Sequence, residues 1–178
     1  CSDIAGLDDT SRISVNVSPI QFMNSDLVVD IQAALAVSGL DPSRLEIEVT
    51  ETVMIKEMER TLETMEEIVA LGVALSLDDF GTGYSSLSYL TQFPFSKIKI
   101  DKTFIASMEK DRRSEDLVRS ILALANALDL QVTAEGVETQ RQFMALVKGS
   151  CDEVQGYLLG KPISFGDLKK VQSKIAIG

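Results

Sequence analysis

The 178-residue chain contains no histidine and no tryptophan. Without an imidazole, the chain cannot build a Ser–His or Cys–His nucleophile pair, a histidine proton shuttle or a histidine-ligated metal site. Its two cysteines, Cys1 and Cys151, do not have the spacing of a metal site, and two thiols do not imply a disulfide framework. Zinc and copper centres are therefore improbable on residue types alone.

The chain also lacks long hydrophobic runs and an excess of basic residues. Its longest mostly apolar runs, near residues 68–77 and 120–130, are shorter than the ~18 residues that span a bilayer. No signal peptide is visible, so we expect a cytoplasmic domain that makes no membrane contact itself, whether or not its parent protein is membrane-anchored. With 17 basic and 27 acidic residues the net charge is −10, which argues against binding a nucleic acid polymer. A phosphate-bearing ligand would be repelled unless metal cations lay between it and the chain.

Length and composition predict one globular domain over residues 1–178. Apolar residues make up 45% of the chain and charged residues 25%, which is ordinary for a soluble domain. A domain typically takes about 150 residues, so the length corresponds to one. Because the first residue is Cys1 rather than methionine, we expect the chain to be a fragment of a longer protein.

Short β-branched runs alternate with amphipathic helical patterns along the whole chain. Several runs are apolar nearly throughout, as expected for parallel strands that helices cover. The predicted strands are Ile13–Val17, Leu45–Thr50, Val73–Asp78, Lys97–Asp101, Leu130–Ala134 and Glu153–Gly156. This alternation predicts a parallel α/β sheet. Periodicity leaves open a doubly wound sheet or a barrel, and a complete eight-unit barrel needs ~250 residues.

Two apolar stripes and three local signals define the helices. The stripes are Met58, Leu62, Met65 and Val69, and Leu117, Ile121, Leu124 and Leu128. We expect Gly72 to end the first helix and Ser114 to cap the second. Thr139 and Gln142 form the pattern of a capping box before a third helix.

Polar side chains gather where the predicted strands end. They are Asn16, Glu48, Glu51, Asp78, Asp79, Lys99, Asp101, Glu135, Glu138 and Gln155. In a parallel fold these positions share one rim, so at least five carboxylates would meet there. Two carboxylates ~4 Å apart repel by ~4 kcal/mol at an effective dielectric constant near 20, so either some are protonated or a divalent cation holds them.

The residue types at this rim favour hard cations. Carboxylates and an amide suit Mg²⁺ or Mn²⁺. Adjacent Asp78 and Asp79 could bridge two ions ~3.5–4 Å apart, the arrangement used for phosphodiester displacement. For each residue alone the ordinary alternative is a helix cap or a solvated charge; Glu138, for example, could simply favour a helix N-terminus.

Six motifs in this order resemble the EAL domain, a family of bacterial phosphodiesterases that cleave cyclic di-GMP to linear pGpG. They are VNVS (15–18), EIEVTE (46–51), DDFGTGYSSL (78–87), KID (99–101), AEGVET (134–139) and CDEVQGY (151–157). The resemblance implies a TIM-like (β/α)8 barrel whose first strand is reversed, with about six of its eight strands in this chain. It also implies two divalent cations, Mg²⁺ or Mn²⁺, and cyclic di-GMP as the ligand.

The resemblance further assigns roles by position. Metal ligands would be Asn16, Glu48, Asp78, Asp79 and Glu135, with Asp78 bridging the two ions. Lys99 would orient or polarise the attacking water, Glu135 would also be catalytic, and Gln155 would line the substrate pocket. Glu51 would anchor the DDFGTGYSSL loop, through which the family often dimerises. The roles of Asp101 and Glu138 are less defined.

One departure from the family concerns the N-terminus. The Glu-Ala-Leu segment should lie some forty residues before Asn16, where only fifteen residues precede it. We therefore expect the first strands, the first helix and one further ligand glutamate to be missing, which would leave an apolar interior and two sheet edges exposed. A catalytically silent EAL domain that senses the nucleotide or acts as a regulatory interaction module remains the alternative to an enzyme.

Overall fold

The computed structural model describes residues 1–6, 11–23, 26–55, 57–81 and 87–167. The strands in these ranges are β1 (Ile13–Asn16), β2 (Leu45–Thr50), β3 (Ala74–Phe80), β4 (Lys97–Ile100), β5 (Gln131–Glu135) and β6 (Glu153–Gln155). The helices are α1 (Ser2–Ala5), α2 (Pro19–Phe22), α3 (Leu27–Ser38), α4 (Thr52–Ile55), α5 (Met58–Ala70), α6 (Leu87–Gln92), α7 (Lys102–Ser107), α8 (Arg112–Ala127) and α9 (Gln140–Lys148). A 3-10 turn, η1 (Pro42–Arg44), precedes β2.

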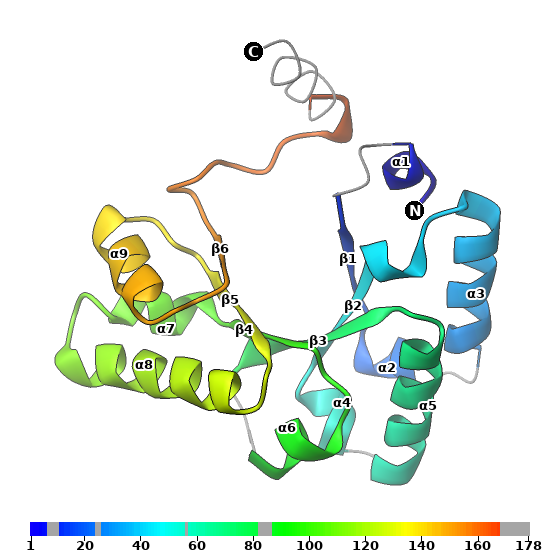
Figure 1. The fold of residues 1–178 in the computed structure, drawn as a ribbon, viewed down its shortest axis with the longest axis horizontal. Coiled ribbons are helices and arrows are strands. Elements are labelled where there is room, and N and C mark those ends of the chain that lie inside the picture. The colour runs from blue at the N-terminus through cyan, green and yellow to red at the C-terminus, as the bar shows by residue number, and fades with distance from the viewer. Residues whose placement is uncertain (7–10, 24–25, 56, 82–86, 168–178) are drawn as a thin grey trace.

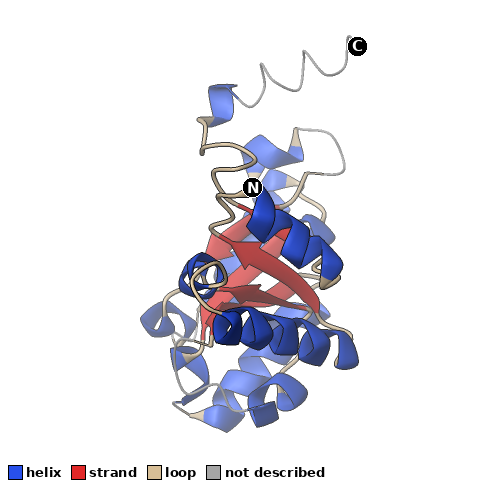
Figure 2. Cartoon of the chain, turned by 90° about the vertical axis from the view of Figure 1, so that its left-hand side faces the viewer, coloured by secondary structure: helices blue, strands red, loops and turns tan. Residues whose placement is uncertain are grey.

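The strands form one parallel sheet in the order β1-β2-β3-β4-β5-β6. Figure 1 shows this sheet curled into a half-barrel, with α3 and α5 outside one half and α8 and α9 outside the other. The view from the side in Figure 2 shows the same strands flanked by helices. The predicted α/β architecture is confirmed, with six strands in the described residues.

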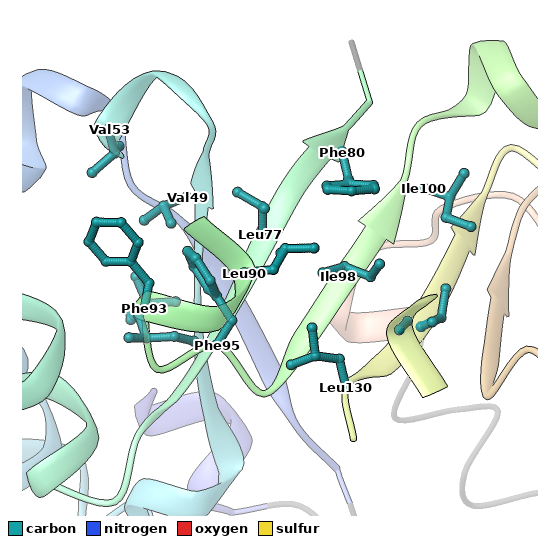
Figure 3. Packing of buried hydrophobic residues seen from close by; sticks show 14 of the residues in the cluster. Val49, Val53, Leu77, Phe80, Leu90, Phe93, Phe95, Ile98, Ile100 and Leu130 are labelled. Atoms are coloured by element: carbon teal, nitrogen blue, oxygen red, sulfur yellow. The ribbon is translucent and has the colours of Figure 1, made fainter. Parts of the chain in front are cut away.

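The apolar core lies between the sheet and its helices. Alternate strand residues point toward the helices and are almost fully buried, including Val49, Leu77 and Ile98. Figure 3 shows these side chains packed beside Phe93 and Phe95, which follow α6. Burial of one such side chain contributes about 1.5–3 kcal/mol, so this layer fixes the position of each strand.

The concave face of the sheet is polar, and the expectation of an exposed apolar interior is wrong. On β2, Leu45, Ile47 and Val49 alternate with two glutamates, and on β4 two isoleucines alternate with two lysines. Side chains of β2, β4 and β6 contact one another although these strands are not neighbours, so they must meet across the concavity. The prediction assigned the apolar strand residues to the interior of the barrel. The charged residues that alternate with them lie there instead, and they are buried as well.

Helix boundaries follow the capping signals with one correction. Asp111, not Ser114, caps α8, because its Oδ1 accepts the Ser114 backbone N–H at 2.8 Å. The capping box of α9 is confirmed: Thr139 accepts from the Gln142 backbone, and the Gln142 side chain accepts from the Thr139 backbone. Gly72 follows α5 with φ +87°, a conformation that favours glycine.

The predicted stripes lie only partly in the core. Met65 and Ile121 are buried, whereas Met58 and Leu117 are exposed. The buried face of α8 consists of Val118, Ile121, Leu122 and Ala125. The stripe through Leu117 therefore ran along the border of the buried face rather than along its centre.

Candidate functional site: two lysine-centred layers on the concave face

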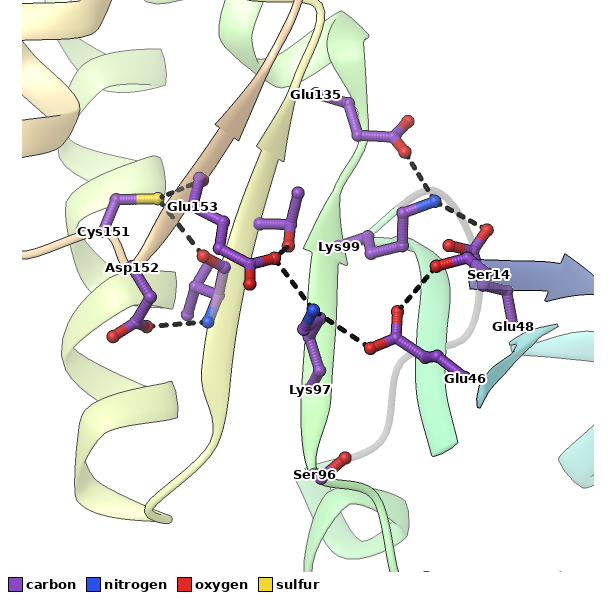
Figure 4. A network of polar contacts seen from close by, with 12 residues as sticks. Ser14, Glu46, Glu48, Ser96, Lys97, Lys99, Glu135, Cys151, Asp152 and Glu153 are labelled. Carbon is purple, nitrogen blue, oxygen red and sulfur yellow. Dashed lines mark hydrogen bonds and ion pairs between the residues drawn. The ribbon is translucent and has the colours of Figure 1, made fainter. Parts of the chain in front are cut away.

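Three carboxylates converge on the ammonium group of Lys99. Its Nζ lies 2.8 Å from Glu48 Oε2, 3.2 Å from Asp78 Oδ1 and 2.7 Å from Glu135 Oε1. These residues come from β4, β2, β3 and β5, each near the carboxyl end of its strand, as Figure 4 shows for Lys99, Glu48 and Glu135. We call these four residues the upper layer. The sequence prediction that carboxylates from separate strands share one rim is met for this set.

The upper layer carries more negative than positive charge. One ammonium group faces three carboxylates, and Lys99 and Glu48 are both buried. Burial opposes the charge on Lys99, but hydrogen bonds to Glu135 and Glu48 outweigh it and raise the pKa of this lysine. Lys99 is therefore a cation throughout the physiological range, and two negative charges of the layer remain uncompensated.

A β-bulge places the two adjacent aspartates at this layer. In the β3–β4 register Leu77 pairs with Ile98 and Phe80 with Ile100, so two aspartates of β3 oppose the single Lys99. Asp79 has φ +55°, a left-handed conformation that aspartate tolerates better than most residues. Its backbone N–H donates to Asp78 Oδ1 at 3.0 Å.

The carboxyl group of Asp79 also interacts electrostatically with neighbouring acidic groups. Burial, followed by repulsion from Asp78 and Asp101, raises the pKa of its carboxyl. A cation at this point would relieve that repulsion. Its assignment as a metal ligand remains a prediction.

Asn16 and Gln155 lie at the two edges of the site. In the sheet register Asn16 is opposite Glu48, and Gln155 is opposite Glu135. Partners in register point to the same face of a sheet, so both amides face the concavity, where they are exposed. Their positions fit the predicted roles of metal ligand and pocket residue, and both roles remain predictions.

An open pocket of about 280 Å³ adjoins the Gln155 side of the site. It is lined by Lys102, Glu135, Gly136, Glu138, Gln155, Gly156 and Tyr157. Gly156 lies so close to the 136–138 loop that an added Cβ would be 2.2 Å from the Val137 carbonyl oxygen. The pocket therefore depends on this glycine, and Glu138 belongs to its wall.

Glu51 and Asp101 hold the backbone next to the site. Glu51 Oε1 accepts the Gly81 backbone N–H at 3.0 Å, immediately after β3. A Cβ on Gly81 would lie 2.9 Å from the Phe104 ring. These contacts agree with the predicted anchoring role of Glu51, but residues 82–86 of the loop lie outside the described residues. Asp101 caps α7 by accepting the Thr103 backbone N–H at 2.9 Å, together with the Thr103 hydroxyl.

A second charged layer, which the sequence analysis missed, lies below the first. Lys97 Nζ is 3.0 Å from Glu46 Oε2 and 2.8 Å from Glu153 Oε2. The Ser14 hydroxyl donates to Glu46 at 3.2 Å, and the Thr133 hydroxyl donates to Glu153 at 2.8 Å (Figure 4). We call these five residues the lower layer. The alternation of charged and apolar residues in KIKI and LEIE indicates that the charged side chains share one face of each strand. That these side chains meet can be seen only when the curvature of the sheet is known.

The upper layer fits divalent cations by its donor chemistry. Within the described ranges, no group of three or more His, Cys, Asp or Glu side chains is arranged to hold a metal ion as it stands. Lys99 Nζ lies at the point where the three carboxylates converge. The donors are nevertheless all oxygen and carry excess negative charge, which hard cations such as Mg²⁺ and Mn²⁺ prefer.

The sequence matches the profile described as EAL domain over residues 1–162. The chain belongs to the EAL domain family. The bifunctional diguanylate cyclase/cyclic di-GMP phosphodiesterase MucR of Pseudomonas aeruginosa is 43% identical to this EAL domain over 152 residues, which are 85% of the chain and 22% of MucR. The chain spans about a fifth of the length of the first curated relatives it matches.

Solved EAL structures share the fold. The MucR phosphodiesterase in complex with c-di-GMP has a TM-score of 0.85 and 42% identity, with 88% of this chain and 64% of that chain covered. For the EAL domain of Mycobacterium smegmatis DcpA the TM-score is 0.92 at 34% identity, with 98% and 80% covered. The calcium/cy-diGMP complex of Klebsiella pneumoniae BlrP1 has a TM-score of 0.80 at 30% identity, with 88% and 40% covered. The half-barrel is therefore of the EAL type, which is TIM-barrel-like.

Among the described residues, no helix combines the length and the apolar character that crossing a membrane requires.

Proposed function

We propose that this EAL domain hydrolyses cyclic di-GMP to linear pGpG at a site that holds two divalent cations, Mg²⁺ or Mn²⁺. The observation that carries the proposal is the convergence of Glu48, Asp78 and Glu135 from three strands around Lys99. The names of MucR and of its solved complex support the nucleotide, and the calcium complex of BlrP1 supports a divalent cation.

The proposed ligand sets follow from position in the fold. Asn16, Glu48 and Asp78 would hold one cation. Asp78, Asp79 and Glu135 would hold the other, with the bulge in β3 placing both aspartates opposite Lys99 in the register. Bound there, the cations would supply Lewis acidity and neutralise the phosphate oxygens.

Three side chains of this chain, those of Lys99, Glu135 and Gln155, would then take part in the reaction. The Lys99 ammonium would hold the attacking water and stabilise negative charge that develops on the phosphate. Water oxygen would bond to phosphorus as one P–O ester bond breaks, and the leaving oxygen would take a proton. Glu135 would act as a catalytic carboxylate beside this bond. Gln155 and the pocket beside it would take part of the nucleotide.

The decisive experiment incubates the intact protein with cyclic di-GMP and Mn²⁺ or Mg²⁺ and separates products by chromatography. Wild type should yield pGpG, whereas Asp78→Asn and Lys99→Met should yield none. The matched control is Asp116→Asn, which changes an exposed aspartate on α8 and should retain wild-type turnover. Wild-type turnover in both site variants would refute the residue assignment. Nucleotide binding by the wild type without turnover would instead identify a sensor.

We further propose a homodimer through the loop after Asp79. Glu51 fixes the start of this loop at Gly81. Sedimentation of the intact protein should give twice the monomer mass, and a monomer at all concentrations would exclude the dimer.

A further inference from the structure

The two layers are related position by position. On five of the six strands in the described residues, all except β3, a lower-layer residue lies two positions before a residue of the site. The pairs are Ser14 and Asn16, Glu46 and Glu48, Lys97 and Lys99, Thr133 and Glu135, and Glu153 and Gln155. Two residues of a strand span about 7 Å, so the lower layer supports the site from one layer below and is too far away to touch a ligand held there.

We propose that Lys97 is a positioning residue that sets the spacing of the upper-layer carboxylates and thereby the affinity of the site for divalent cations. This inference rests on the proposed function, because it concerns the same cations. Lys97 is buried, and its two partners belong to β2 and β6, each two strands away from β4. One ammonium group thus joins strands from both halves of the half-barrel.

Sheet hydrogen bonds cannot join strands across the concavity, because each of them joins only neighbouring strands. The apolar core lies on the other side of the sheet, between strands and helices. Strand twist and the packing of the helices give the sheet its general curvature, and attraction across the concave face adjusts it. Lys97 supplies that attraction in the lower layer, where Glu46 and Glu153 would otherwise repel each other.

A change in the curvature of the sheet would change the distances between the proposed cation ligands. Glu48 follows Glu46 on β2, and Gln155 follows Glu153 on β6, with one outward-facing residue between them in each case. If Glu46 and Glu153 move apart, Glu48 moves away from Glu135, which is paired with Gln155 in the register. Carboxylates held for two cations tolerate little such displacement, since coordination distances are short and fixed.

The test compares Lys97→Met, which removes the charge but keeps the length, with Lys97→Arg, which keeps the charge. The control, Lys110→Met, removes an exposed lysine after α7. For the intact protein, the Mn²⁺ dissociation constant is measured by electron paramagnetic resonance of the free ion. Thermal unfolding in EDTA and the kcat and KM for cyclic di-GMP at saturating Mn²⁺ are measured in parallel.

We expect Lys97→Met to raise the Mn²⁺ dissociation constant by about 10–100-fold, the range found when partners of metal ligands are lost. At saturating Mn²⁺ its KM for the nucleotide should stay near wild type, and Lys97→Arg should restore most of the Mn²⁺ affinity. A lysine with a merely structural role would lower the unfolding temperature without changing the Mn²⁺ affinity. An unchanged Mn²⁺ dissociation constant in folded Lys97→Met therefore overturns the inference.

If Lys97→Met does not fold, Glu153→Gln decides, because it removes the negative charge that pairs with Lys97 from the exposed residue on β6 and keeps the Lys97–Glu46 pair. A weaker Mn²⁺ affinity in Glu153→Gln supports the inference, and an unchanged affinity overturns it. Failure of the proposed function has a different signature, because wild type would then bind Mn²⁺ without forming pGpG.

Discussion

Replacing Lys99 by methionine should separate cation binding from turnover. The substitution keeps most of the side-chain length and removes the positive charge that faces Glu48, Asp78 and Glu135. Without the ammonium group, three carboxylates are left together on a largely buried surface. In the absence of divalent cations they repel one another, so the folded state is destabilised.

The distances set the size of this effect. An ion pair near 3 Å is worth about 5–6 kcal/mol at an effective dielectric constant of 20, before the cost of burying the charges. Removing one partner of a buried pair costs about 3–5 kcal/mol in practice. For a domain of this size, each kcal/mol lowers the midpoint temperature of unfolding by about 2–4 °C. In EDTA, Lys99→Met should therefore unfold roughly 6–20 °C below wild type.

Divalent cations should reverse this loss. A cation between the carboxylates replaces the missing charge, so the gain in unfolding temperature on adding Mn²⁺ should be larger for Lys99→Met than for wild type. Turnover of cyclic di-GMP should stay absent, since in the proposed mechanism the lysine also holds the attacking water. The assay is thermal unfolding followed by circular dichroism, with and without Mn²⁺, beside Lys110→Met as control. Equal Mn²⁺ stabilisation of wild type and Lys99→Met would refute the view that the lysine and the cations neutralise the same carboxylates.

Three further outcomes follow from single contacts. Gly156→Ala should destabilise the domain by about 1–3 kcal/mol or more in urea unfolding, because its Cβ would lie 2.2 Å from the Val137 oxygen. Gly160→Ala, with no atom within 4 Å of the added Cβ, should be neutral, and equal effects would contradict the close-packing argument. Thr139→Ala should cost about 1 kcal/mol by removing the cap of α9, whereas Thr139→Ser should cost much less; identical losses would mean that the cap is unimportant. Burial raises the pKa of the Cys151 thiol from 9.0 to about 11, so in a Cys1→Ser variant alkylation by iodoacetamide at pH 8 should be roughly 100-fold slower than for an exposed thiol. An inflection of the alkylation rate near pH 9 would contradict that burial effect.

The sequence was sufficient to predict which residues share the rim. Parallel strands end on the same side, so Glu48, Asp78, Lys99 and Glu135 could be placed together from the strand–helix alternation alone. The capping box at Thr139 could be recognised for a similar reason, because all its partners are within four residues. Local patterns therefore gave the edge of the sheet on which the site lies.

Contacts across the concavity could not be predicted in this way. Lys97 meets Glu46 and Glu153 only because the sheet curls, and these residues are 51 and 56 positions away in the sequence. A curled sheet and a flat sheet have the same hydrophobic periodicity. The bulge that sets two aspartates of β3 opposite Lys99 cannot be predicted from the sequence pattern either, because it depends on the register with the next strand.

The same curvature explains how a chain with a net charge of −10 could bind the anionic nucleotide proposed as its substrate. Curling concentrates acidic side chains on the concave face and places one lysine in each layer, so each layer has more carboxylates than ammonium groups. The resulting excess charge is costly in a largely buried setting, and this cost is lowered by any bound divalent cation. Cation affinity and stability of the half-barrel are thus two consequences of one charge distribution, so a substitution that changes the lysine-to-carboxylate balance should change both together.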